Sequence, residues 1–175
     1  PSAASLAQVF AYLTGRDAHI VAGDSLADDP FADVKADLIV CEPPLGMYPP
    51  RQDDSALRGA SSRVMSARRS SGPQGAAEEL FLLYAAERLT AGGRGYIMTG
   101  TSVTYRERFK DHRQRLVAEG RVEAVVELPS GVFSATRLPA ALWVLSAEKV
   151  AEPLLIDASG QTQKSVPLRI ADWLT

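Results

Sequence analysis

The sequence predicts a doubly wound α/β sheet, and two features of the chain support this class. Short apolar stretches alternate with amphipathic ones, as strands and helices do in such sheets. Glycine, proline and acidic residues gather where the apolar stretches end. With 175 residues, 46% of them hydrophobic, the chain can bury a sizeable core. Ligands of these sheets bind at the carboxyl ends of strands, so the residues there are the first site candidates.

The chain opens with a predicted helix followed by two predicted strands. "SLAQVFAYLTGR" carries an apolar stripe and ends near a typical helix stop, Gly15. "HIVAGD" reads as a short strand that ends at Asp24, and "ADLIVCE" as the next strand. The unbroken apolar run of this second strand predicts burial on both of its faces, as in a parallel sheet.

The second half of the chain continues the alternation. Helices are predicted over residues 76–89 and 105–120, with Tyr105, Phe109, Leu116 and Val117 sharing a face of the second. Strands are predicted at "RGYIMTG", "VEAVVELP", "ALWVLSAE" and "PLLIDA". We expect residues 1–150 to form the main domain and residues 151–175 to add a closing strand and tail.

Residues 47–75 differ in composition from the rest of the chain. They are rich in serine, glycine and proline, and five arginines against two aspartates give a local charge of +3. We expect a long, flexible, basic loop, which is either simply solvated or binds a polyanion.

Several classes of protein are disfavoured by composition. A net charge of −2 excludes a generic polyanion binder, so any such contact must be local. The single cysteine, Cys41, and two histidines predict neither an internal disulfide nor a metal site. No apolar run approaches the roughly 20 residues that span a bilayer, and no signal peptide is evident, so we expect a cytoplasmic protein without membrane contact.

The stretch "ADLIVCEPPLG" places a carboxylate against two prolines at the end of a strand. Each proline fixes φ near −65° and lacks an N–H, so this corner is stiff and its carbonyls point outward. The Glu42 carboxylate and the Pro43 carbonyl are two acceptors in a rigid frame, which suits an exocyclic amine presented to an electrophilic methyl group. A solvated strand-end residue is the alternative interpretation of Glu42.

Five segments in the right order resemble the adenine-specific DNA methyltransferases, the N-6 DNA methylase family, and most of all the modification subunits of type I restriction–modification systems. These segments are "GDSL", "ADLIVCEPPLG", "FLLYAAERLTAGGRGYIM", "VEAVVELPSGVFSATRLPAALWVLS" and "PLLIDAS". The resemblance implies the Rossmann-like sheet of class I methyltransferases, of which this chain would be the carboxyl-terminal two-thirds. The family's glycine-rich cofactor loop is expected upstream of "SLAQVFAY".

The resemblance also implies ligands and site residues. S-adenosylmethionine would be the cofactor, duplex DNA with a flipped adenine the substrate, and a separate specificity subunit the partner. The cofactor's adenosine would be held by Asp24, Ser25 and Leu26. The target amine and base would be held by Glu42, Pro43, Pro44 and Leu45. Contacts to DNA would come from Tyr48, Arg63, Arg68 and Arg69.

Two positions depart from the family pattern. Glu42 stands where the family has asparagine, and it lacks the amide's donor group. Leu45 stands where the family has an aromatic residue, so it has no π face for the base, and Tyr48 is a candidate replacement. A silent module that binds DNA or cofactor, and a methyltransferase of a protein glutamine or small amine, are therefore the alternative hypotheses. For Asp24 the alternative is a plain Gly-Asp turn.

Overall fold

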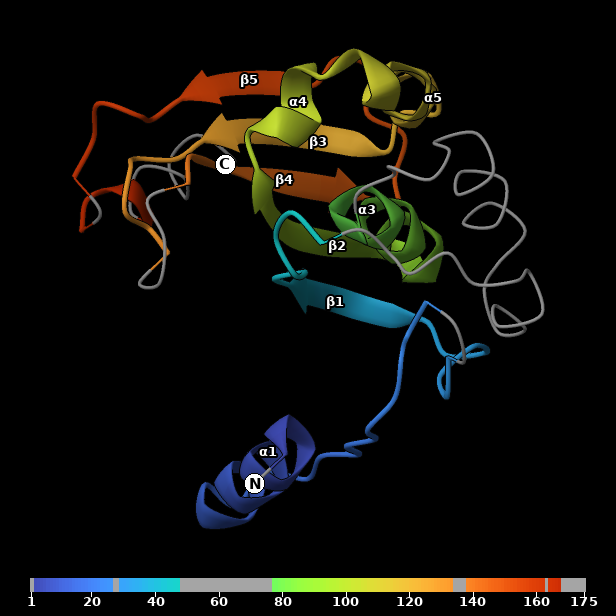
Figure 1. Ribbon diagram of the computed structural model, residues 1–175. Helices are drawn as coiled ribbons and strands as arrows, with labels where there is room; N and C mark the ends of the chain where they lie inside the picture. Colours follow the sequence, from blue (N-terminus) through green and yellow to red (C-terminus); the bar gives the residue numbers. More distant parts are fainter. Residues whose placement is uncertain (1, 27–28, 48–76, 134–137, 163, 168–175) are drawn as a thin grey trace. The chain divides into compact units, whose positions relative to one another are not determined.

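The computed structural model describes residues 2–26, 29–47, 77–133, 138–162 and 164–167 (Figure 1). The chain divides into two compact units. The first unit comprises Pro1–Asp33 and Gln52–Ala60, and the second comprises Val34–Arg51 and Ser61–Thr175. The predicted basic loop lies outside the described residues, apart from Met47.

The first unit contains the predicted helix, α1, over Ala3–Leu13. Ser2 caps it by accepting a hydrogen bond from the Ser5 N–H. Gly15 adopts a φ of 64° after the last turn, as its role as a helix stop predicts. The strand predicted over residues 19–24 is wrong, because this segment is irregular and the described residues of the first unit contain no strand. An apolar run becomes a strand only beside a hydrogen-bonding neighbour.

The second unit is built on one five-stranded sheet, which confirms the α/β class. Its strands are β1 (Ala36–Cys41), β2 (Leu89–Gly100), β3 (Val122–Glu127), β4 (Ala140–Ser146) and β5 (Leu154–Asp157). Their order across the sheet is β1-β2-β4-β3-β5. β1 pairs with β2 and β3 with β5 in parallel, whereas β4 is antiparallel to both of its neighbours. Four strands therefore point one way, and β4 is inserted against them.

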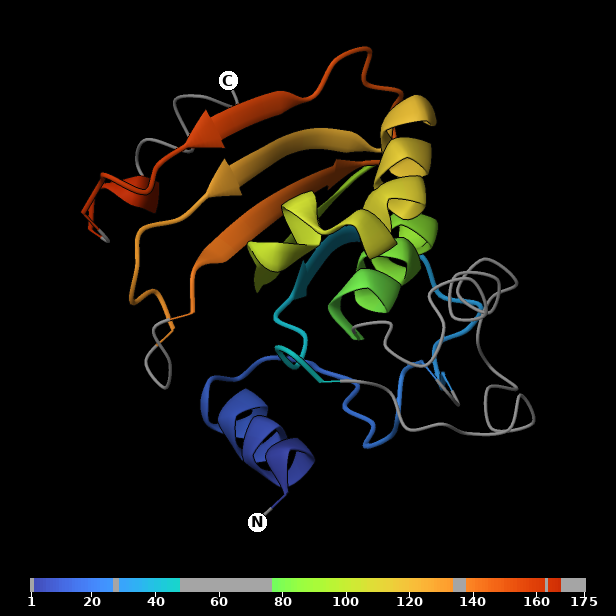
Figure 2. The same ribbon diagram turned by 45° about the horizontal axis from the view of Figure 1, so that its top comes forward.

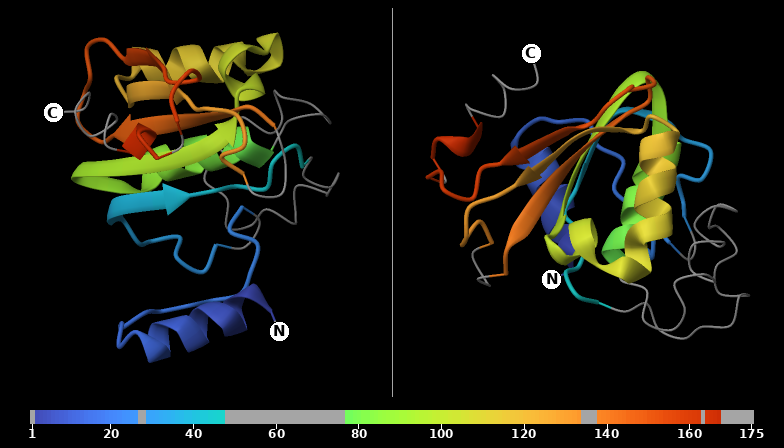
Figure 3. Two further views of the ribbon diagram at one scale, coloured as in Figure 1. Left: turned by 90° about the vertical axis from the view of Figure 1, so that its left-hand side faces the viewer. Right: turned by 90° about the horizontal axis from the view of Figure 1, so that it is seen from above.

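Both long helices of the second unit cover the same face of the sheet (Figures 2 and 3). They are α3 (Ala77–Arg88) and α5 (Lys110–Ala118). The chain crosses from β1 to β2 and then from β2 to β3, and both crossovers run in the same direction across the sheet. Because such crossovers share one handedness, the helices they contain lie on the same face. The core between helices and sheet includes Leu80, Leu83, Ile97, Phe109 and Leu116, all almost fully buried.

The single helix predicted over residues 105–120 is wrong. The segment forms α4 (Ser102–Tyr105), the short 3-10 helix η3 (Glu107–Phe109) and then α5, with a break at Arg106. Arg106 is extended, with a ψ of 133°. The break turns Tyr105 outward, with 66% of its surface exposed, while Phe109 is fully buried.

The expectation that β1 is buried on both faces is also wrong. Leu38 and Val40 are 61% and 77% exposed, whereas Ile39 and Cys41 are partly buried. These pairs lie on opposite faces because side chains alternate along a strand. The described helices of this unit cover only one face of the sheet (Figure 3), so the other face of β1 stays open. In the described part of the chain, no helix is long and apolar enough to cross a membrane.

Gly120 offers a test of the packing beneath α5. Its φ is 68°, and a Cβ there would lie 2.6 Å from Lys149 Cγ and 2.8 Å from the Val150 oxygen. We expect Gly120→Ala to lower the free energy of unfolding by about 2–4 kcal/mol, through backbone strain and this clash. Gly160 has open space around it, so Gly160→Ala is the control and should change stability by less than about 0.5 kcal/mol. Urea denaturation measures both, and equal effects would contradict this packing.

Candidate active site

The stiff corner predicted from sequence follows directly after β1. Glu42 is exposed, Pro43 is buried and Pro44 is exposed. The chain then turns at Leu45 and Gly46, where Gly46 adopts a φ of 64° that suits glycine. The corner thus presents the Glu42 side chain at the carboxyl end of a parallel strand, where ligands of such sheets bind.

A buried carboxylate fastens this corner to the neighbouring strand. Glu78 Oε2 accepts a hydrogen bond from the Gly46 N–H at 3.1 Å, and Oε1 accepts one from the Gly100 N–H at 2.7 Å. Gly100 is the last residue of β2, so one side chain joins the corner after β1 to the end of the adjacent strand β2. Glu78 is only 3% exposed and lies in the first turn of α3, where the helix dipole favours negative charge.

The sequence gives little sign of this role. Acidic residues are common in the first turn of a helix, where they are usually solvated, and Glu78 and Glu79 fit that pattern. The only available signal is that two adjacent glutamates open a helix otherwise rich in leucine and alanine. Which backbone groups they meet depends on the tertiary structure.

A cavity of about 270 Å³ opens beside the corner. One wall is formed by Leu45, Gly46 and Glu78, and the other residues around it are Gly100, Thr101, Ser102, Tyr105, Arg106, Arg108, Leu138 and Pro139. Leu45 also packs against a buried cluster that contains Val126, Leu128, Phe133 and Ala140. The Leu45 side chain is therefore partly committed to the core.

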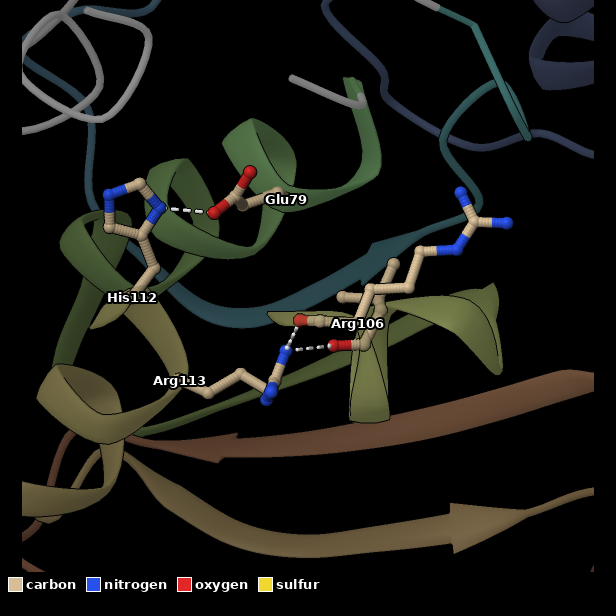
Figure 4. Close-up of polar contacts among 5 residues, drawn as sticks. Glu79, Arg106, His112 and Arg113 are labelled. Atoms are coloured by element: carbon tan, nitrogen blue, oxygen red, sulfur yellow. Dashed lines mark hydrogen bonds and ion pairs between the residues drawn. The ribbon is translucent and has the colours of Figure 1, made fainter. Parts of the chain in front are cut away.

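A second buried glutamate joins α3 to α5 (Figure 4). Glu79, 3% exposed at its side chain, pairs with Nδ1 of His112 on α5. At the next residue, an Arg113 guanidinium nitrogen donates to the Val103 carbonyl at 3.0 Å and to the Arg106 carbonyl at 2.8 Å. These bonds fix the turn between α4 and η3, where the Arg106 carbonyl also accepts a hydrogen bond from the Phe109 N–H at 3.1 Å.

The predicted cofactor residues lie in the first unit. Asp24 is exposed, Ser25 is partly exposed and Leu26 is buried. Asp24 Oδ1 accepts a hydrogen bond from the Leu26 N–H at 3.0 Å, so the Gly-Asp step forms the local turn that was the alternative interpretation. An exposed carboxylate nevertheless fits an adenosine, whose amine needs an acceptor.

The predicted DNA-contacting residues Tyr48, Arg63, Arg68 and Arg69 lie outside the described residues. Within the described ranges, no cluster of three or more histidine, cysteine, aspartate or glutamate side chains is arranged to hold a metal ion.

The reactivity of the Cys41 thiol depends on the charge of its neighbour Glu42. Burial raises the pKa of its thiol, and the negative charge of the adjacent Glu42 raises it further. The thiolate is the reactive form, so alkylation of Cys41 should be slow at pH 8 and speed up as the pH rises through the raised pKa. Glu42→Gln removes the charge and lowers that pKa. We therefore expect iodoacetamide to label Cys41 faster at pH 8 in Glu42→Gln than in the unaltered protein. The control Glu152→Gln should be labelled at the rate of the unaltered protein. Equal labelling rates in all three proteins would contradict the effect of Glu42 on Cys41.

Glu78→Gln tests the carboxylate that joins the corner to β2. An amide has one acceptor oxygen, so one of the two glycine N–H groups loses its partner. We expect a loss of about 1–3 kcal/mol in the free energy of unfolding and faster hydrogen exchange in residues 42–47. Glu123→Gln, which removes the charge from a partly exposed pair with Arg94, is the control and should cost less than about 1 kcal/mol. Unchanged exchange in residues 42–47 would contradict the role given to Glu78.

Comparisons with known proteins agree with this architecture. The family model for N-6 DNA Methylase matches residues 1–170. The type I restriction enzyme MjaIX methylase subunit of Methanocaldococcus jannaschii is 24% identical over 155 residues. The match covers 85% of this chain and 27% of that relative, so this chain spans about a quarter of the relative's length.

Solved structures share the fold. The methyltransferase subunit of a type I restriction-modification system from Streptococcus thermophilus superposes with a TM-score of 0.77 and 21% identity, over 97% of this chain and 39% of that chain. A candidate class I S-adenosylmethionine-dependent methyltransferase from Listeria monocytogenes gives a TM-score of 0.69 and 20% identity, over 97% and 50% of the two chains. The predicted class I methyltransferase sheet is thus confirmed. With a family model that covers nearly its whole length, this chain belongs to the N-6 DNA methylase family.

Proposed function

We propose that the protein containing this chain transfers a methyl group from S-adenosylmethionine to the exocyclic amine of adenine in duplex DNA. We further propose that it does so as the modification component of a restriction–modification or phage-defence system. The observation that carries this proposal is the Glu42-Pro43-Pro44 corner, held at the carboxyl end of β1 by Glu78, in a chain of the N-6 DNA methylase family.

In the proposed reaction the chain's own residues bind and orient. The Glu42 carboxylate and the Pro43 carbonyl accept hydrogen bonds from the target amine and fix its direction of attack. Because Glu78 bonds Gly46, the corner keeps its place relative to β2 while the amine is held. Asp24, Ser25 and Leu26 hold the adenosine of S-adenosylmethionine, which supplies an electrophilic methyl group when bound.

The proposed partners follow from the relatives and from the basic loop. The M. jannaschii and S. thermophilus proteins are named as subunits, which supports assembly of this protein with a separate specificity subunit. The +3 charge of residues 47–75 supports contact with the DNA backbone through Arg63, Arg68 and Arg69, with Tyr48 nearby in sequence. This local basic charge also favours DNA over a protein glutamine or small amine as substrate.

A catalytically silent module is the second candidate function. Glu42 places its acceptor oxygens one methylene further from the backbone than asparagine does, and a displacement of about 1 Å can lower a rate about 10²-fold. Leu45 removes the aromatic face expected for the base. In this alternative, the protein binds DNA or cofactor to regulate or assemble.

Methyl transfer by the full-length protein separates the two candidates. We expect labelled methyl from S-adenosylmethionine to appear on adenine in DNA, and Glu42→Ala to lower kcat at least about 10²-fold because an acceptor for the amine is lost. Glu152→Ala, an exposed carboxylate before β5, is the matched control and should leave kcat unchanged.

If the parent protein transfers no methyl group, the Glu42→Asn variant decides between the two candidate functions. A silent parent whose Glu42→Asn variant is active would mean that the pocket survives while the chemistry has been lost, and the silent module would then be correct. Activity in the parent that Glu42→Ala leaves intact would remove Glu42 from the proposed mechanism.

A further inference from the structure

The cavity beside the corner carries an aromatic side chain that the corner itself lacks. Leu45 has no π face, and its side chain packs against the buried cluster around Leu128 and Phe133. Tyr105 lines the same cavity and exposes 66% of its surface. A single exposed tyrosine needs no explanation on a protein surface. One that shares a cavity with Leu45, the residue predicted to contact the base, does call for one.

The turn that presents Tyr105 is fixed from several sides. Arg113 donates to the carbonyls of Val103 and Arg106, on either side of Tyr105 (Figure 4). The Thr101 N–H donates to the Pro139 carbonyl at 3.0 Å, and the Arg106 N–H donates to the Ser102 carbonyl at 3.1 Å. The backbone that carries the Tyr105 ring is therefore in place before any ligand arrives, which lowers the entropic cost of binding.

The charge next to this ring is positive. Arg106 is exposed, lines the cavity and makes no ion pair within the described part of the chain, and Arg108 also lines the cavity. The nearby acidic groups are engaged elsewhere. Glu107 pairs with Lys110 at 2.8 Å, and both Glu78 oxygens accept backbone N–H groups. An aromatic face beside a cation is the chemistry that binds a nucleotide, through its base and its phosphate.

We propose that Tyr105 and Arg106 form the surface that receives the target nucleotide: Tyr105 stacks on the flipped base and Arg106 contacts its phosphodiester. This inference rests on the proposed function and names the residue that replaces the aromatic missing at Leu45. It assigns that role to the turn after β2 in place of Tyr48.

Base stacking is tested with the full-length protein and a duplex in which the methylated adenine, located by sequencing the methylated product, is replaced by 2-aminopurine. Fluorescence of this base rises on flipping and is quenched by a stacked ring. We expect Tyr105→Leu to brighten the bound complex several-fold and to lower kcat/KM for DNA about tenfold, with KM for S-adenosylmethionine unchanged. Tyr105→Phe keeps the ring and should match the unaltered protein within about twofold.

Arg106→Gln tests the phosphate contact. The slope of log affinity for DNA against log salt concentration should become shallower by about one. Arg115→Gln is the matched control, because Arg115 is exposed on α5, pairs with Glu119 and does not line the cavity. Its slope should stay unchanged.

The outcomes separate this inference from the proposed function. A parent protein that does not methylate adenine overturns the proposed function and, with it, this inference. A parent that methylates adenine while the Tyr105→Leu complex is no brighter than its own, or while Tyr48→Leu alone brightens the complex, overturns the assignment of Tyr105 and leaves the proposed function standing. An unchanged salt slope in Arg106→Gln overturns the phosphate contact.

Discussion

The arrangement around the corner depends on one buried carboxylate. Glu78 gives both of its oxygens to backbone N–H groups, one just beyond β1 and one at the end of β2. Burying an ion is unfavourable unless it is fully hydrogen bonded, and here two donors and the amino-terminal turn of α3 supply that compensation. Since α3 connects β1 to β2, the same helix that crosses the sheet also fixes the spacing of the two strand ends beside the cavity.

Those parts of the fold that rest on local chemistry could be predicted from sequence. The runs that became β1, β3 and β4 are mostly apolar, and α3 has leucine and alanine at helical spacing. The segment 19–24 shows the limit of this reasoning, because its apolar run has no hydrogen-bonding neighbour among the described residues. The helix break at Arg106 was also hidden, because the turn there is fixed by the side chain of Arg113, seven residues away.

The candidate site divides in the same way. The rigidity of Glu42-Pro43-Pro44 follows from proline itself, so the corner could be recognised in the sequence, although the part each residue plays in a reaction stays a prediction. Glu78 and Tyr105 could not be recognised, because their importance comes from which segments they meet. Glu78 bonds an amide 32 residues away, and Tyr105 shares a cavity with Leu45. Local pattern identifies the chemical groups of a site, whereas tertiary structure determines which of them face one another.

The antiparallel insertion of β4 has a consequence for the order of folding. β4 follows β3 in the chain yet lies between β2 and β3, so those two strands cannot be joined into the sheet until β4 is made. The segment just before β4 supplies Leu138 and Pro139 to the cavity, more than ninety residues after Leu45. Contacts of such long sequence separation form slowly, because a large loop must close first. The cavity is therefore complete only late in folding, and chains that are still folding lack a finished binding surface.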